Sequence, residues 1–70
     1  MKELGRNLLE ATNSMVESEI QKDRANLSIL LENPVGIGEH IDLVADVYKL
    51  VDGIAHKEDV LDTVRTLLRG

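Results

Sequence analysis

Asn33-Pro34-Val35-Gly36-Ile37-Gly38 divides the 70-residue chain into two segments, because it lies near the middle and holds the only proline and two of the five glycines. The residue before a proline is disfavoured in the helical region, so a first helix should stop near Glu32. The sequence predicts a turn over residues 33–40, built around Asn33, Pro34, Gly36 and Gly38. Gly36 or Gly38 is expected at positive φ, which valine reaches only at a cost.

On both sides of this turn, apolar residues recur with the period of an α-helix. The predicted helices cover residues 2–32 and 41–69, within one domain that spans residues 1–70. Two helices of similar length joined by a short connection favour an antiparallel hairpin. The predicted fold class is therefore all-α.

Each predicted helix carries an apolar seam. In the first helix the seam residues are spaced seven, four, seven and four: Leu9, Val16, Ile20, Leu27 and Leu31. The same helix has a second stripe, made of Leu4, Leu8, Ala11 and Met15. In the second helix a heptad places Lys57 among seven apolar residues, Leu43, Val47, Leu50, Ile54, Leu61, Val64 and Leu68, flanked by Val44, Val51, Val60 and Leu67. These seams predict the core and an oligomer interface.

The composition indicates that this core needs a partner. Hydrophobic residues make up 43% of the chain, but Tyr48 is its only aromatic residue and it has no cysteine. A small chain without disulfides buries too little surface to be very stable alone. The extra apolar stripes predict self-association, with a homodimer forming an antiparallel four-helix bundle. Higher even-numbered oligomers remain open, because aliphatic seams do not determine the number of helices in a bundle well.

Charge and hydropathy exclude several classes of partner. The net charge is −5, which opposes binding to nucleic acid. No apolar run approaches the length of a membrane span. The first residues, Met1 to Arg6, lack the apolar core of a secretion signal, so we expect a cytoplasmic protein without membrane contact.

Two groups of residues could carry chemistry. Glu39, His40 and Asp42 could bind a metal, but a closed site needs about four ligands, and carboxylates at a helix start are common for capping. His56 follows Asp52 by four residues, which is also the spacing of a helix-surface pair. No serine or threonine lies three or four residues from a histidine. We therefore expect no enzyme activity, no cofactor and no metal, with the turn residues as the less favoured alternative.

Two further positions depend on the register of the hairpin. If the chain turns around residues 36–37, Gly53 faces Ile20, and Lys57 faces Val16 and Glu17. Glycine within a helix costs about 1 kcal/mol relative to alanine, so Gly53 either allows a close approach of the helices or is merely tolerated. Lys57 either pairs with a glutamate and specifies register or reaches water at the rim.

Residues 32–40, from Glu32 to His40, resemble a recurring turn in small helical proteins of tailed phages, including phages of marine cyanobacteria. In these proteins the downstream helix often has an element similar to Ile54-Ala55-His56-Lys57-Glu58-Asp59. The resemblance implies a phage origin and action inside a bacterial host or in virion assembly. We expect a non-enzymatic interaction protein that binds itself, with a host or phage protein as a further candidate partner. The alternative is a minor structural or assembly component of a virion.

Overall fold

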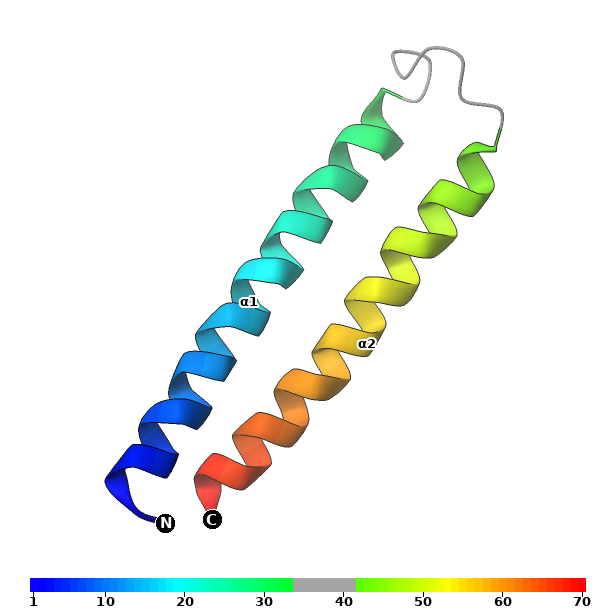
Figure 1. The fold of residues 1–70 in the computed structure, drawn as a ribbon. Coiled ribbons are helices and arrows are strands. Elements are labelled where there is room, and N and C mark those ends of the chain that lie inside the picture. The colour runs from blue at the N-terminus through cyan, green and yellow to red at the C-terminus, as the bar shows by residue number, and fades with distance from the viewer. Residues whose placement is uncertain (34–41) are drawn as a thin grey trace.

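The computed structural model describes residues 1–33 and 42–70, and within these ranges the chain consists of two α-helices and no strand. Helix α1 spans Glu3–Glu32 and helix α2 spans Leu43–Arg69. The helices lie side by side and run in opposite directions, so that both termini lie at the same end (Figure 1). The molecule measures 51 × 14 × 14 Å. The predicted two-helix antiparallel hairpin is thus confirmed.

The ends of the helices follow from local hydrogen bonds. Helix α1 ends where Asn33 leaves the helical region, with its N–H donating to the carbonyl of Ile29 at 3.0 Å. Helix α2 begins at Leu43, two residues later than predicted, because the Asp42 Oδ1 accepts the N–H of Ala45 at 2.9 Å as an N-cap. Of the predicted turn residues, Pro34, Gly36 and Gly38 lie outside the described residues.

The core is one layer of aliphatic side chains between the two helices. It is made of three residues from each helix, all less than a tenth exposed: Val16, Ile20, Leu30, Ile54, Leu61 and Val64. Five of these belong to the predicted seams. Six other predicted seam residues are half-buried at the edges of the layer: Leu9, Leu27, Leu43, Val47, Leu50 and Leu68.

Leu31 is a predicted seam residue that the structure places on the surface. Its side chain is 60% exposed, whereas the neighbouring Leu30 is 6% exposed and takes its place in the core. The buried seam of α1 alternates steps of four and three residues, so that after Leu27 it continues to Leu30. The prediction counted apolar residues only and therefore missed the two polar members of this seam, Asn13 and Asp23, which are both half-buried.

The predicted register is also wrong. Lys57 contacts Asp23 rather than Glu17, and the nearest side chain to Gly53 is again Asp23. Compared with the predicted register, α2 is therefore shifted along α1 by about two helical turns, toward the C-terminal end of α1. The predicted register would have placed the charge of Lys57 against Val16, whereas the observed one places it against a carboxylate.

Candidate interaction surface

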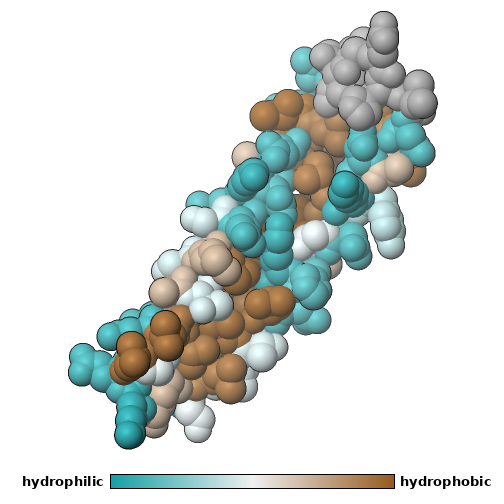
Figure 2. All heavy atoms as spheres, in the orientation of Figure 1, coloured by the Kyte–Doolittle hydropathy of each residue, from teal (hydrophilic) through white to brown (hydrophobic). Residues whose placement is uncertain are grey.

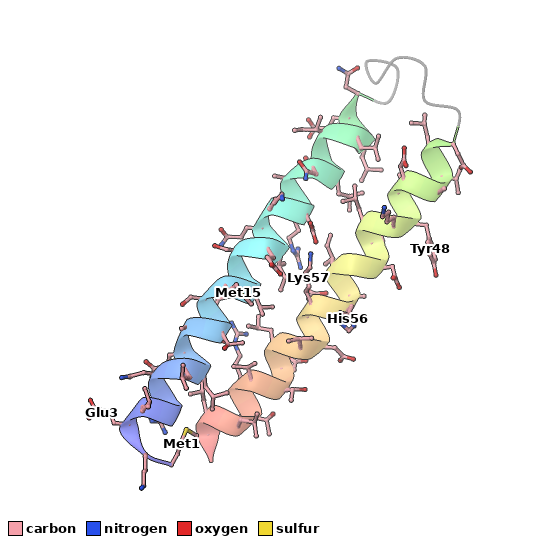
Figure 3. All side chains as sticks on the ribbon, viewed as in Figure 1. Met1, Glu3, Met15, Tyr48, His56 and Lys57 are labelled. Carbon is pink, nitrogen blue, oxygen red and sulfur yellow. The ribbon has the colours of Figure 1, made fainter. Side chains whose placement is uncertain are left out.

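A polar pair interrupts the apolar layer midway along the hairpin. The Lys57 Nζ donates to the Asp23 Oδ2 at 2.6 Å, and the two side chains are 29% and 15% exposed. Lys57 lies between the two helices in Figure 3. The hydrogen bond to Asp23 raises the pKa of the Lys57 ammonium above its ordinary value of 10.5; burial opposes this shift, and the charges of Asp23 and Glu19 support it. A charged pair at a seam position restricts the register that two helices can adopt.

The raised pKa of Lys57 predicts a loss of stability in base. A group whose pKa is higher in the folded state stabilises that state fully below its unfolded value, and the contribution disappears as pH rises through the folded value. We expect the melting temperature to fall above about pH 10.5 more steeply in the parent than in Lys57→Met. Circular dichroism at several pH values measures this, and parallel curves for the two proteins would show that the pair contributes nothing.

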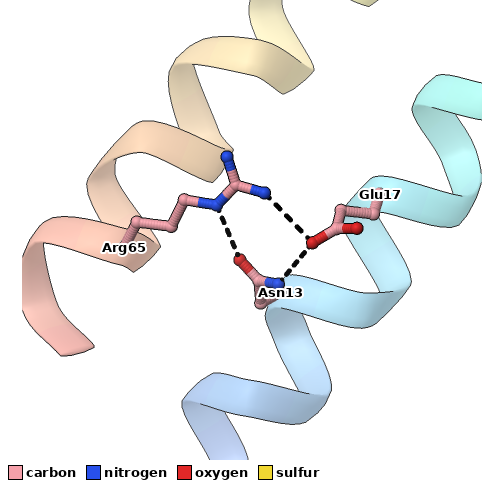
Figure 4. A network of polar contacts seen from close by, with 3 residues as sticks. All are labelled: Asn13, Glu17 and Arg65. Carbon is pink, nitrogen blue, oxygen red and sulfur yellow. Dashed lines mark hydrogen bonds and ion pairs between the residues drawn. The ribbon is translucent and has the colours of Figure 1, made fainter.

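A second set of polar contacts lies beside the seam (Figure 4). The Arg65 guanidinium donates to Glu17 at 3.1 Å and to Asn13 at 3.4 Å, while the Asn13 amide donates to Glu17 at 2.6 Å. About two helical turns further along, Arg24 and Glu58 form an ion pair at 2.7 Å. The side chains of the two ion pairs are about half exposed, so each pair contributes less than about 1 kcal/mol to stability.

The ion pairs identify one of the two long faces of the hairpin. Each residue turns a helix by about 100°, so in antiparallel helices the side chains that directly follow a seam residue point to the same face. Glu17 and Arg24 follow seam residues of α1, and Glu58 and Arg65 follow seam residues of α2, which is why they meet. We call this the ion-pair face.

Side chains that directly precede a seam residue point to the opposite face. In the half of the hairpin nearer the turn, these side chains line a shallow groove. Asn26 lines it from α1, and Asp46, Lys49 and Gly53 line it from α2. We call this the groove face, and it is the face toward the viewer in Figures 1 to 3.

Gly53 lies in this groove without a close neighbour. A Cβ added to it would lie 3.6 Å from the Asp23 Oδ2, which is an ordinary van der Waals distance. The structure therefore gives no steric requirement for glycine, and the hypothesis of a close helix approach at Ile20 fails with the register on which it rested.

We predict that Gly53→Ala stabilises the hairpin by about 1 kcal/mol, because alanine has the higher helix propensity and its methyl group fits the groove. Urea unfolding followed by circular dichroism measures the effect. Ala55→Gly on the exposed surface of the same helix is the reverse control and should destabilise by a similar amount. A destabilised Gly53→Ala protein would mean that something else packs closely at this position.

Most of the exposed large hydrophobic side chains form two separate patches, and Met1 and Ile29 lie outside them. The terminal patch lies on the groove face near the chain ends, where residues that precede seam positions are apolar. It consists of Leu4, Leu8, Met15 and Leu67, and it is bordered by Val60, which is half-buried against the core. Hydrophobic atoms gather on this half of the molecule in Figure 2, hydrophilic atoms cover much of the middle, and a smaller hydrophobic area lies near the turn. The patch joins the second stripe of α1, noted in the sequence, to the flanking Leu67 of α2.

The turn patch lies on the ion-pair face near the other end. It consists of residues that follow seam positions: Leu31, Val44, Tyr48 and Val51. Val51 lines a depression with Arg24 and Glu58, and Leu31 lines another with Arg24, which places both on this face. The two patches are therefore on opposite faces and at opposite ends.

The residues predicted to carry chemistry are not brought together where the structure describes them. Glu39 and His40 lie outside the described residues, and the Asp42 carboxylate serves as a helix cap. Asp52 and His56 are both exposed on α2. Across residues 1–33 and 42–70, no three His, Cys, Asp or Glu side chains are grouped so that they could hold a metal ion.

Comparison with models of protein families, with curated proteins and with solved structures finds no match. Neither of the two described helices is long and apolar enough to cross a lipid bilayer. The fold and the surface together define an antiparallel helical hairpin with exposed apolar patches.

Proposed function

We propose that this protein is a non-enzymatic helical interaction protein that associates with itself. Its smallest stable unit is a homodimer in which two hairpins pack as a four-helix bundle. On the resemblance of its turn to proteins of tailed phages, we place it in the cytoplasm of a bacterial host, where a host or phage protein is a further partner. The observation that carries the proposal is the mismatch between buried and exposed apolar surface.

This mismatch is visible in the burial of individual side chains. Among the described residues, no large side chain is less than 2% exposed, so the core has no fully enclosed centre. In contrast, many large hydrophobic residues are at least about half exposed, among them Leu4, Leu8, Met15, Ile29, Leu31, Val44, Tyr48, Val51 and Leu67. A soluble monomer rarely exposes large contiguous apolar patches, and such patches usually mark sites of protein association.

Size gives a second argument for self-association. Two helices that touch only each other bury a single stripe each, and a small domain without disulfides is only marginally stable. A second copy is the partner that is always present at the concentration of the protein itself. Two-fold pairing is also the commonest closed symmetry of homo-oligomers.

Sedimentation equilibrium over a range of micromolar concentrations tests the proposal. We expect a mass of twice 7.8 kDa, and a melting temperature that rises with protein concentration, because the dimer stabilises the folded state by mass action. A folded monomer of 7.8 kDa, independent of concentration, would overturn the proposal.

A further inference from the structure

The two apolar patches restrict how a second hairpin can pack on the first. On the groove face, the terminal half is apolar, whereas the half nearer the turn carries the polar Glu19, Asn26, Asp46 and Lys49 together with the exposed Ile29. On the ion-pair face the order is reversed, with Arg65 and Glu17 in the terminal half and apolar residues near the turn. No long face is apolar from end to end.

Only one kind of packing covers the apolar half of the groove face with apolar surface and leaves the polar half in water. If two hairpins overlap fully with their turns at the same end, the polar halves face each other. If they overlap fully with their turns at opposite ends, each terminal patch faces the polar half of the other copy. If they overlap only by their terminal halves, the two patches cover each other and the polar halves remain in water, which avoids the cost of burying them.

The distribution of charge selects the terminal patch over the turn patch. Residues 18–55 carry seven acidic and three basic side chains, whereas residues 1–17 and 56–70 together carry six acidic and five basic ones. Two copies that met at their turn ends would bring two strongly negative halves together, which is unfavourable. The terminal ends are nearly neutral and meet without this repulsion.

We infer that the homodimer is staggered: two hairpins pair through their terminal patches, around a two-fold axis perpendicular to the helices, with their turn ends pointing in opposite directions. The inference rests on the proposed self-association and specifies its surface. Met15 and Leu67 lie in the contact between the copies, and the turn patches stay exposed at the two ends of the dimer.

Matched substitutions in the two patches test which one is used. Met15 and Val51 are similarly exposed, at 56% and 49%. By sedimentation equilibrium we expect Met15→Asp to weaken dimerisation by more than about tenfold, because it places a charge among apolar side chains at a symmetric contact. Val51→Asp should dimerise like the parent. If Val51→Asp dissociates the dimer and Met15→Asp does not, the inference is wrong although the proposed self-association stands. A monomeric parent would overturn the proposed function itself.

A distance measurement keeps the test decisive if Met15→Asp fails to fold. The chain has no cysteine, so Ala45→Cys on the exposed surface of α2 gives a single site for a spin label near the turn end. The centre of the terminal contact lies some 20 residues away, so labels in the staggered dimer are separated by about 60 Å. A pulsed electron resonance distance longer than the 51 Å hairpin supports the stagger. A shorter distance means fully overlapped hairpins and overturns it.

Discussion

Leu61→Asp is expected to unfold the hairpin and to abolish its self-association together. Leu61 is 7% exposed and packs with Val16 and Ile20 at the centre of the core. Loss of a buried leucine costs about 2–5 kcal/mol, and an unpaired buried charge adds several more. The sum is comparable with the whole stability of a small domain.

Val44→Asp is the matched control for this substitution. It makes a similar change in hydropathy and the same change in charge on the same helix, but Val44 is 81% exposed and lies in the turn patch. The staggered dimer leaves this patch in water, so we expect the control to stay helical and dimeric. Circular dichroism and sedimentation equilibrium measure both properties. A helical Leu61→Asp protein would show that the cluster of Leu61, Val16 and Ile20 does not hold the hairpin together.

The double substitution Asp23→Leu with Lys57→Leu is expected to stabilise the hairpin, because apolar side chains in the seam avoid the cost of partly desolvating two charges. Either single substitution should destabilise, since it leaves a charge on the apolar seam without its partner. We also expect the double variant to lose specificity of register or of oligomeric state.

Arg24→Ala with Glu58→Ala is the control, because this pair lies one residue further along each helix but is exposed on the rim. Its removal should change the free energy of unfolding by less than about 1 kcal/mol. Urea unfolding gives the free energies, and sedimentation velocity gives the distribution of species. A double variant at Asp23 and Lys57 that is less stable than the parent would mean that the polar pair itself holds the seam together.

The sequence was sufficient for the parts of the fold that depend on local pattern. The proline and the glycines near Asn33 divide the chain into two segments, and the apolar period within each segment indicates a helix. The heptad of α2 correctly included Lys57, because its neighbours at steps of three and four made the missing apolar position evident. The helix ends are predicted less accurately: capping by the Asp42 carboxylate is among the alternatives, but the predicted second helix begins at residue 41, ahead of this cap, whereas α2 begins at Leu43.

Only the tertiary structure decided which residues meet across the hairpin. Helical periodicity repeats every turn, so sliding one helix past the other by two turns preserves every apolar stripe, and the pattern alone cannot choose between these registers. The observed register is the one in which Lys57 pairs with the carboxylate of Asp23 and Arg65 pairs with Glu17. Leu30 rather than Leu31 enters the core for the same reason, because the polar Asn13 and Asp23 continue a seam that apolar residues alone do not reveal.

The candidate surface divides in the same way. The exposed stripe of Leu4, Leu8 and Met15 and the flanking valines of α2 can be read from the sequence, and they indicate that a single hairpin leaves apolar surface uncovered. Their separation into two patches, on opposite faces and at opposite ends, depends on which α2 residues lie beside which α1 residues. A sequence specifies which side of each helix is apolar, through local helical geometry. The apolar sides of two helices combine into one surface only when long-range polar contacts have set the register between the helices.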